Sequence, residues 1–322
     1  MNNNFEIFYD QSNSKNYILE CHKLISNDNI VPIITNIPRF VSSDNYAIDF
    51  GFQWNEFSNT QLDSYTKTKI SENRLQKLMQ GHLNKVKNKL ILEAGSGAGR
   101  FTEILLKYNA KVHSFDYSNA VEANAKNNGS SNNLTLAQAS IDSIPFEKET
   151  YDYVICIGVL QHTPNPEICI KNLWKMVKPG GHMIIDHYAF KWSYILPPPI
   201  GGSESIYRFF IQLLPHKYKY LIVKKIVDFF FQFHWFFRNK LFIQRLLRRI
   251  SPLHFYYPEF SLSSKELYYQ WSLLDTHDGL TDKYKHYRSK KQIENFFKLF
   301  NYDYLAVSKG GNGIEVFCTK KN

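Results

Sequence analysis

A glycine-rich turn and a downstream acid are the residues of this chain whose types and spacing best suggest chemistry. Gly95, Gly97 and Gly99 follow a short apolar stretch, and Asp116 ends the next apolar stretch. Glycines between a strand and a helix let a ligand approach the backbone, and the start of the helix offers free N–H groups. A carboxylate at the end of the second strand can accept hydrogen bonds from ribose hydroxyls. The pattern predicts a site for an adenosine-containing cofactor.

The glycine spacing separates the candidate cofactors. Dinucleotide sites carry G-x-G-x-x-G, in which the third glycine permits close helix–strand packing. Here the spacing is G-x-G-x-G, and Arg100 occupies the third glycine position of the dinucleotide pattern. Glu93 precedes the turn, where its carboxylate could face an ammonium group. These residues favour a nucleoside that carries an amino acid and disfavour a nicotinamide dinucleotide.

Apolar runs alternate with helical stretches around this motif. We expect strands over residues 90–94, 111–115, 134–139, 151–157, 182–186, 302–308 and 313–319. A helix before the stop signal at 177–181 and an amphipathic helix over 289–300 complete the pattern. Alternating strands and helices with short connections predict an α/β fold with a mostly parallel, doubly wound sheet.

Five motifs then occur in a recognisable order between about residues 75 and 190. They are residues 93–100, 116–118, 140–146, 158–166 and 178–181. The series resembles the class I (Rossmann-like) S-adenosylmethionine-dependent methyltransferases, and most of all the branch that includes the ubiquinone and menaquinone biosynthesis enzymes. The resemblance implies a seven-stranded sheet with an antiparallel last strand, an N-terminal extension and a helical cap insertion.

The same resemblance implies S-adenosylmethionine as cofactor and assigns ten residues to its site. In such enzymes the glycine turn shapes the methionine end, the acid binds the ribose diol, and side chains from the next two motifs cover the adenine. The ten expected residues are Glu93, Gly95, Ser96, Gly97, Asp116, Tyr117, Ser140, Ile141, Ile157 and Gly158.

Two positions depart from the family pattern. Ser140 stands where an acid usually contacts the adenine amino group, although Asp142 lies close by in the sequence. Gln161 replaces one histidine of the usual G-V-L-H-H-T-P motif, while His162 is kept. These departures leave open a protein that binds the cofactor without turnover.

Three histidines are candidates for a general base. His162 follows the fourth strand and His187 the fifth, where the carboxyl ends of a parallel sheet line its active crevice. His277 stands between Asp275 and Asp278, and a neighbouring acid can increase the basicity of an imidazole. The alternatives are a structural histidine for His162 and a polar loop for His277. None of the three has metal-ligand spacing, so no metal site is expected.

The N-terminal flank also resembles a subgroup of this family, found in polysaccharide and secondary-metabolite clusters, through residues 37–41, 50–54 and 61–64. That leader often carries a zinc-ribbon module with C-x-x-C. Only Cys21 stands near that position, and one thiolate cannot hold a tetrahedral zinc ion. We therefore expect a zinc-ribbon-like remnant without zinc ligands, followed by a helix that covers the cofactor.

These observations divide the chain into four expected segments. They are an N-terminal extension over residues 1–70, a cofactor-binding core over 71–190, a helical cap over 191–275, and a C-terminal helix and strands over 276–322. The cap is expected to begin after the breaker sequence at 197–202, which is rich in proline and glycine.

The cap is strongly basic and aromatic. Residues 206–250 carry ten Lys and Arg side chains and one acid, Asp228, which gives a formal charge of +9 out of +10 for the whole chain. The aromatics could pack on the sheet as a substrate lid, with solvated cations. Aromatic and basic residues could instead make peripheral contact with an anionic membrane. Nucleic-acid binding through phosphates is a third interpretation, but no recognisable nucleic-acid module accompanies it.

The overall composition sets the context. The 322 residues suffice for a sizeable core, and four scattered cysteines do not form a disulfide framework, which favours a reducing cytoplasm. The first residues lack the basic and apolar regions of a signal peptide, and no apolar run reaches 18 residues.

We therefore expect a cytoplasmic S-adenosylmethionine-dependent methyltransferase that acts by in-line transfer on a hydroxyl of a sugar, glycan precursor or related small molecule. This acceptor follows from the resemblance of the flanks. A lipid-linked or quinone-like acceptor at the membrane surface is the alternative, suggested by the apolar, basic cap.

Overall fold

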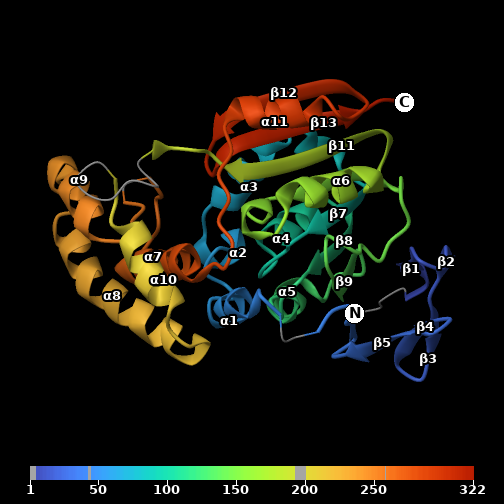
Figure 1. Ribbon diagram of the computed structural model, residues 1–322, viewed down its shortest axis with the longest axis horizontal. Helices are drawn as coiled ribbons and strands as arrows, with labels where there is room; N and C mark the ends of the chain where they lie inside the picture. The colour runs from blue at the N-terminus through green and yellow to red at the C-terminus, as the bar shows by residue number, and fades with distance from the viewer. Residues whose placement is uncertain (1–4, 43–44, 193–200, 258) are drawn as a thin grey trace.

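Seven apolar segments pair into one sheet in the order β12-β13-β11-β10-β7-β8-β9 (Figure 1). The computed structural model describes residues 5–42, 45–192, 201–257 and 259–322. Strands β7 to β11 are parallel, and β13 runs antiparallel to both β11 and β12. The expected fold, a mostly parallel sheet with an antiparallel last strand, is confirmed. The strands are β7 (Leu90–Ala94), β8 (Lys111–Asp116), β9 (Leu134–Gln138), β10 (Tyr151–Cys156), β11 (Val177–Tyr188), β12 (Tyr302–Gly310) and β13 (Gly313–Lys320).

Strand β11 begins earlier than the apolar pattern predicts. Helix α6 (Pro166–Met176) ends where the stop signal was expected, after starting at an Asn165 cap whose side chain accepts from the Ile168 N–H. The residues of the stop signal then join the sheet, because Val177 pairs with Tyr151 before the register shifts. A short bulged segment therefore extends the strand backwards from His182.

Helices cover both faces of this sheet. Leu92 and Val154 face one side and pack in a core with α6 and α11 (Lys290–Phe297). Ile91 and Ile155, the adjacent residues, face the other side and pack with α3 (Ile70–Leu78), α4 (Arg100–Lys107) and α5 (Val121–Asn128). Neighbouring side chains of a strand point to opposite faces, so nearly continuous apolar runs are what a doubly covered sheet requires.

Helix α11 is shorter than the expected helix over 289–300. It ends at Phe297, and Ser289 caps its start in a reciprocal arrangement with Gln292. Ile293 and Phe297 are buried against the sheet, with Phe296 and Phe300 partly buried beside them. The predicted apolar face is confirmed.

The N-terminal segment forms two small antiparallel sheets and then helices. The first sheet pairs β1 (Tyr9–Asp10) with β2 (Lys15–Asn16), after the 3₁₀ turn η1 (Phe5–Ile7). The second contains β3 (Ile18–Glu20), β4 (Lys23–Ser26), β5 (Asn29–Ile34) and β6 (Ile37–Pro38), followed by α1 (Ile48–Glu56), α2 (Asp63–Thr66) and, after α3, the turn η2 (His82–Lys85). Phe8 joins this part to the core by stacking on Phe146 at 5.3 Å and tilting against Phe40 at 5.4 Å.

The cap is a group of four helices at the end of the molecule away from the N-terminal sheets (Figure 1). It consists of α7 (Glu204–Gln212), α8 (His216–Phe236), α9 (Leu241–Ile250) and α10 (Lys265–Thr281). Its buried aromatic residues, including Phe231, Phe255 and Trp271, form a separate core together with Phe57. They pack on one another, which differs from the interpretation in which the cap aromatics pack on the sheet.

The four-segment division remains a proposal. Helix α10 runs continuously through the expected boundary between residues 275 and 276. Most of the breaker at 197–202 lies outside the described residues, which resume at Gly201. Among the described helices, none combines the length and apolar character that crossing a bilayer requires.

Replacing Phe8 tests how the N-terminal sheets are attached. Phe8 is fully buried, so Phe8→Ala should cost about 3 kcal/mol or more of unfolding free energy through lost contacts and a cavity. Thermal and urea unfolding followed by circular dichroism would measure this cost. Leu19→Ala, at a half-exposed position, is the matched control and should change stability little. Equal stability of the two variants would contradict the attachment.

Candidate active site

A cavity of about 750 Å³ opens at the carboxyl ends of the parallel strands. Residues after β7, β8, β9 and β10 form its floor, and side chains from α1, α3 and α10 form its walls. This edge of a parallel sheet is where ligands bind in open α/β folds. Nine of the ten residues expected to bind the cofactor line this cavity, and Glu93 alone does not.

The glycine turn forms part of the floor because side chains cannot fit there. Gly95 and Gly97 have φ values of +76° and +52°. A Cβ on Gly95 would lie 2.3 Å from Val159, and one on Gly97 would lie 3.0 Å from the Trp54 ring. Gly99, at φ +85°, would meet Asn124 of α5 at 2.2 Å. The first two glycines therefore leave the backbone open to a ligand, whereas Gly99 allows α4 and α5 to pack closely.

Asp116 ends β8 and connects that strand to the glycine turn. Its Oδ2 accepts the Gly97 N–H at 2.9 Å, and its Oδ1 accepts the Ser118 N–H at 2.8 Å and the Ser118 hydroxyl at 2.7 Å. Burial raises the pKa of this carboxyl above its ordinary value. A carboxylate offers about four lone-pair positions, so capacity remains for a ligand hydroxyl.

Aromatic and apolar residues line the next part of the cavity. Tyr117 stacks on Tyr46 with ring centroids 4.9 Å apart, and Ile141 and Ser140 also face the cavity. The Ser140 hydroxyl accepts the Asp142 N–H at 3.0 Å. The sequence motifs did not identify Tyr46, because it precedes α1 and belongs to no motif. Only contact in three dimensions brings it beside Tyr117.

Two arginines give another part of the wall positive charge. Arg74 of α3 pairs with Asp186 at 2.6 Å, and the other Asp186 oxygen accepts the Gly158 N–H at 2.6 Å. Arg100 donates to Gln61 at 2.5 Å. Burial lowers the pKa of Arg100 to about 10, which leaves it charged near neutrality. In the sequence, Arg100 stands out only as a departure from the dinucleotide pattern, and Arg74 belongs to none of the five motifs.

Glu93 lies beneath the glycine turn and not on the cavity wall. It is buried and accepts hydrogen bonds from the hydroxyls of Thr102 and Ser114, the latter at 2.8 Å. Burial raises the pKa of its carboxyl to about 7. Glu93 therefore lies behind the glycine turn, and the expectation that it faces an ammonium group stays a prediction.

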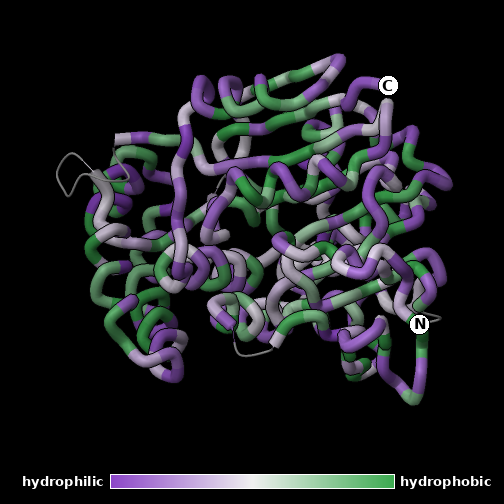
Figure 2. The backbone as a smooth tube through the Cα atoms, turned by 45° about the vertical axis from the view of Figure 1, so that its right-hand side comes forward, coloured by the Kyte–Doolittle hydropathy of each residue, from purple (hydrophilic) through white to green (hydrophobic). Residues whose placement is uncertain are grey.

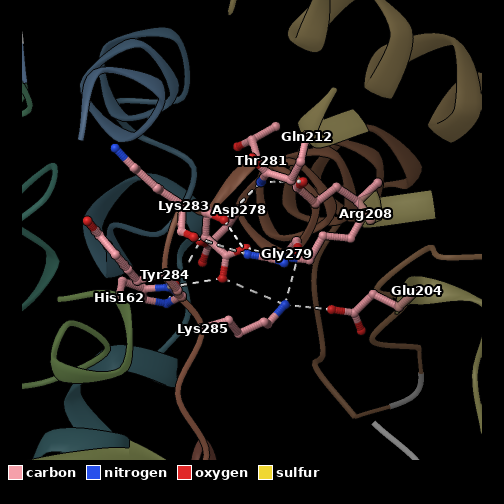
Figure 3. Close-up of polar contacts among 12 residues, drawn as sticks. His162, Glu204, Arg208, Gln212, Asp278, Gly279, Thr281, Lys283, Tyr284 and Lys285 are labelled. Atoms are coloured by element: carbon pink, nitrogen blue, oxygen red, sulfur yellow. Dashed lines mark hydrogen bonds and ion pairs between the residues drawn. The ribbon is translucent and has the colours of Figure 1, made fainter. Parts of the chain in front are cut away.

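His162 is the candidate base that reaches the cavity. It lies in the short turn η3 (Leu160–His162), with Nδ1 3.2 Å from Asp282 Oδ2 and Nε2 4.0 Å from Asp278 Oδ1 (Figure 3). Burial acts to lower the pKa of the imidazole, but Asp278 and Asp282 outweigh it and raise the pKa above the ordinary value. Its Nε2 makes no hydrogen bond to the described residues, which leaves that atom available to a ligand.

The other two histidines do not line the cavity. His187 is buried with Nδ1 3.1 Å from the Tyr188 carbonyl, and burial lowers its pKa to about 4. His277 lies on α10 and contacts Gln53 at 2.8 Å, and its pKa is also lowered to about 4 by burial. Neither position supports a role as the base, which for His187 and His277 stays a prediction.

Helix geometry explains why His277 lies off the cavity wall. Residues 275 and 278 are three apart and share a face of α10, whereas residue 277 points to another face. Asp275 and Asp278 therefore line the cavity while His277 packs against α1. The predicted alternative of a polar loop is wrong, since Lys265–Thr281 is one helix.

A buried charge cluster connects the cap to this region (Figure 3). Arg208 of α7 donates to Asp282 at 2.8 Å, and Lys285 lies 3.8 Å from the same carboxylate. Lys285 also pairs with Glu204 at 2.6 Å, and Glu204 lies 3.6 Å from His254. Burial opposes ionisation of Asp282, but Lys285 and His162 outweigh it and keep its pKa below the ordinary value.

Gln161 adds an amide to the cavity wall. It is fully buried, and neither polar atom of its side chain has a hydrogen-bond partner among the described residues. A buried amide without a partner is costly, so a ligand that supplies a donor or acceptor there would gain free energy.

Comparison with known proteins now identifies the core. Residues 92–185 match the family model described as a methyltransferase domain. This segment is a class I methyltransferase domain. It contains the glycine turn, Asp116 and His162, and a methyltransferase domain implies S-adenosylmethionine as the methyl donor.

Curated relatives match this methyltransferase domain over part of their length. The ubiquinone biosynthesis O-methyltransferase of Coxiella burnetii is 31% identical over 100 residues, which are 30% of this chain and 43% of that protein. The tRNA U34 carboxymethyltransferase of Nautilia profundicola is 26% identical over 176 residues, 53% of this chain and 56% of that protein. The chain thus spans about half the length of the curated relatives that it matches.

One similar solved structure aligns with most of this chain. It is a putative S-adenosylmethionine-dependent methyltransferase from Methanococcus maripaludis, 14% identical, with a TM-score of 0.46. The similarity covers 88% of this chain and 97% of that one.

The charge environment of His162 can be tested by titration. Asp278→Asn removes a carboxylate that raises the His162 pKa, so that pKa should fall toward or below its ordinary value. Nuclear magnetic resonance of labelled histidine side chains would follow the titration. Glu259→Gln, a change at another carboxylate of the cavity wall, should leave the His162 pKa in place. An unchanged pKa in Asp278→Asn would contradict the assignment.

Proposed function

We propose that this protein is an S-adenosylmethionine-dependent methyltransferase that methylates a hydroxyl group of a sugar- or glycan-type acceptor. The observation that carries the proposal is the position of His162. His162 lines the same cavity as the glycine turn and Asp116, and its Nε2 has no hydrogen-bond partner among the described residues, so a donor site and a candidate base share one cavity.

The residues of the cavity fit the donor. A Cβ at Gly95 or Gly97 would collide with Val159 or Trp54, so the turn requires glycine at both positions. Asp116 retains acceptor capacity for the ribose hydroxyls. Tyr117 and Ile141 would enclose the adenine, and Arg74 and Arg100 are positive partners for the methionine carboxylate. S-adenosylmethionine supplies an electrophilic methyl group when bound there.

Other walls of the cavity suit an acceptor with hydroxyl groups. Tyr256, Phe260 and Trp271 form an aromatic wall, with Tyr256 and Phe260 stacked at 4.8 Å and Phe260 5.0 Å from Trp271. Asp278 lies on the same cavity and its Oδ1 makes no hydrogen bond to the described residues. A sugar presents both apolar faces and hydroxyl donors, and this combination of wall and carboxylate complements both.

His162 would take the proton that a hydroxyl must lose on methylation. The neutral imidazole accepts at Nε2, and Asp282 and Asp278 stabilise the imidazolium that results. Because these carboxylates raise the His162 pKa, the rate should increase as pH rises through that pKa and then level. Most of the remaining rate enhancement would come from holding the acceptor oxygen in line with the methyl group.

A lipid-linked acceptor is the second candidate. It is supported by the exposed apolar side chains of α7, α8 and α9, which belong to the same cap whose α10 lines the cavity. A membrane-bound acceptor could then enter beside the cap.

The donor assignment is tested by calorimetry. The wild-type protein should bind S-adenosylmethionine and S-adenosylhomocysteine but not NAD. Asp116→Ala should weaken binding of both sulfur nucleosides by about 1–3 kcal/mol through lost hydrogen bonds to the ribose. Asp303→Asn, at an exposed position of β12 that does not line the cavity, is the control for a general change of charge. Equal affinity of Asp116→Ala and wild type would remove the ribose assignment.

The base assignment is tested by turnover. With labelled donor and a panel of sugar, glycan and lipid-linked acceptors, His162→Ala should reduce the rate roughly 100-fold or more while donor affinity persists. His187→Gln is the matched control, because that histidine is equally buried but does not line the cavity. A wild-type rate in His162→Ala would return this residue to a structural role. Donor binding with no transfer to any acceptor would favour a binding protein without turnover.

A further inference from the structure

Helix α9 directs its apolar side chains outward. Leu241, Phe242, Leu246 and Ile250 are 66%, 72%, 50% and 59% exposed. Positions 242, 246 and 250 are four residues apart and form one stripe along the helix. A surface helix normally buries such a stripe in the core of its own domain, so this helix has the opposite orientation.

A buried polar contact holds α9 in this orientation. Gln244 is 5% exposed, and its amide donates to the His234 carbonyl at 2.9 Å. The Gln244 carbonyl oxygen lies 2.8 Å from Nδ1 of the same histidine. Rotating α9 to bury its stripe would break both bonds and leave buried polar groups without partners.

Two neighbouring helices of the cap also expose apolar residues. These residues are Ile206, Phe209, Phe210 and Leu213 on or just after α7, and Leu221, Phe229, Phe233 and Phe236 on α8. Figure 2 shows apolar and polar segments alternating along the cap helices. Single exposed apolar residues are ordinary on a protein surface, but a concentration of large ones in one substructure indicates a contact site.

The positive charge of these helices indicates which kind of partner their exposed apolar surface can bind. Lys217, Lys225, Lys240 and Arg245 are exposed beside the apolar residues. The one acid between residues 206 and 250, Asp228, pairs with Lys224 at 2.8 Å. A second copy of this chain would bring two strongly positive surfaces together, which is unfavourable. A surface that is both negatively charged and apolar complements them.

We propose that the cap surface binds the interface of an anionic lipid bilayer. The cap surface comprises the exposed apolar side chains of α7, α8 and α9 named above, together with Lys217, Lys225, Lys240 and Arg245. Helices of this type lie in the plane of the interface, with apolar side chains among the acyl chains and cations at the headgroups. The binding is peripheral, and it does not depend on the proposed methyl transfer.

Vesicle flotation tests the proposal. Wild-type protein should float with vesicles of phosphatidylcholine and phosphatidylglycerol, and much less with phosphatidylcholine alone or at high salt. The combined variant Phe242→Ser, Leu246→Ser and Ile250→Ser should reduce bound protein about tenfold or more, through loss of buried apolar area. Lys240→Gln with Arg245→Gln should weaken binding about tenfold or more to the anionic vesicles alone.

The matched control carries Ile18→Ser, Leu19→Ser and Ile30→Ser. These residues are 62%, 50% and 60% exposed on the N-terminal sheets, far from the cap along the chain. This variant should bind vesicles like wild type, and titration with S-adenosylhomocysteine verifies the fold of every variant independently of turnover. Absence of binding to anionic vesicles, or equal binding by the α9 variant, would overturn the proposal. A dimer in sedimentation velocity that the α9 variant abolishes, without vesicle binding, would overturn it in favour of a second copy.

Discussion

A buried carboxylate, Asp282, holds the helical cap against the sheet. It receives Arg208 from α7, faces His162 beyond the fourth parallel strand, and lies near Lys285. Such a charge is stable inside a protein only while its partners remain, because an unpaired buried ion is strongly destabilising. This cluster connects α7 and the end of α10 to His162 beside the cavity at the carboxyl ends of the strands. The position of the cap and the charge of the candidate base thus have the same origin.

The sheet and the glycine turn were predictable because their signals are local. Apolar runs at 90–94 and 151–157 identify doubly buried strands, and the glycines with Asp116 identify the edge where a ligand can approach. Glu93, His187 and His277 lie off the cavity wall, which could not be foreseen because sequence adjacency does not reveal which way a side chain points. The spacing of Asp275, Asp278 and Asp282 by three and four residues was the available signal for a shared helical face.

In the cap, the orientation of the aromatic side chains could not be predicted for a second reason. Its aromatic content suggested that these side chains pack in the interior. The same residue types, however, form both an internal core around Phe231 and Trp271 and an exposed stripe that includes Phe242. Composition cannot separate these two uses. The deciding detail is one polar pair, Gln244 with His234, whose burial orients α9. Tyr46 and Arg74 were missed for a similar reason, since only tertiary folding brings them to the cavity.

The cavity is assembled from two parts of the chain. Its floor, from Gly95 to His162, lies within the methyltransferase domain at residues 92–185. Its opposite wall, with Tyr256, Trp271 and Asp278, comes from an insertion outside that domain. Under the proposed function, the methyltransferase domain would recognise the donor, and the cap would shape the space that is left for the acceptor.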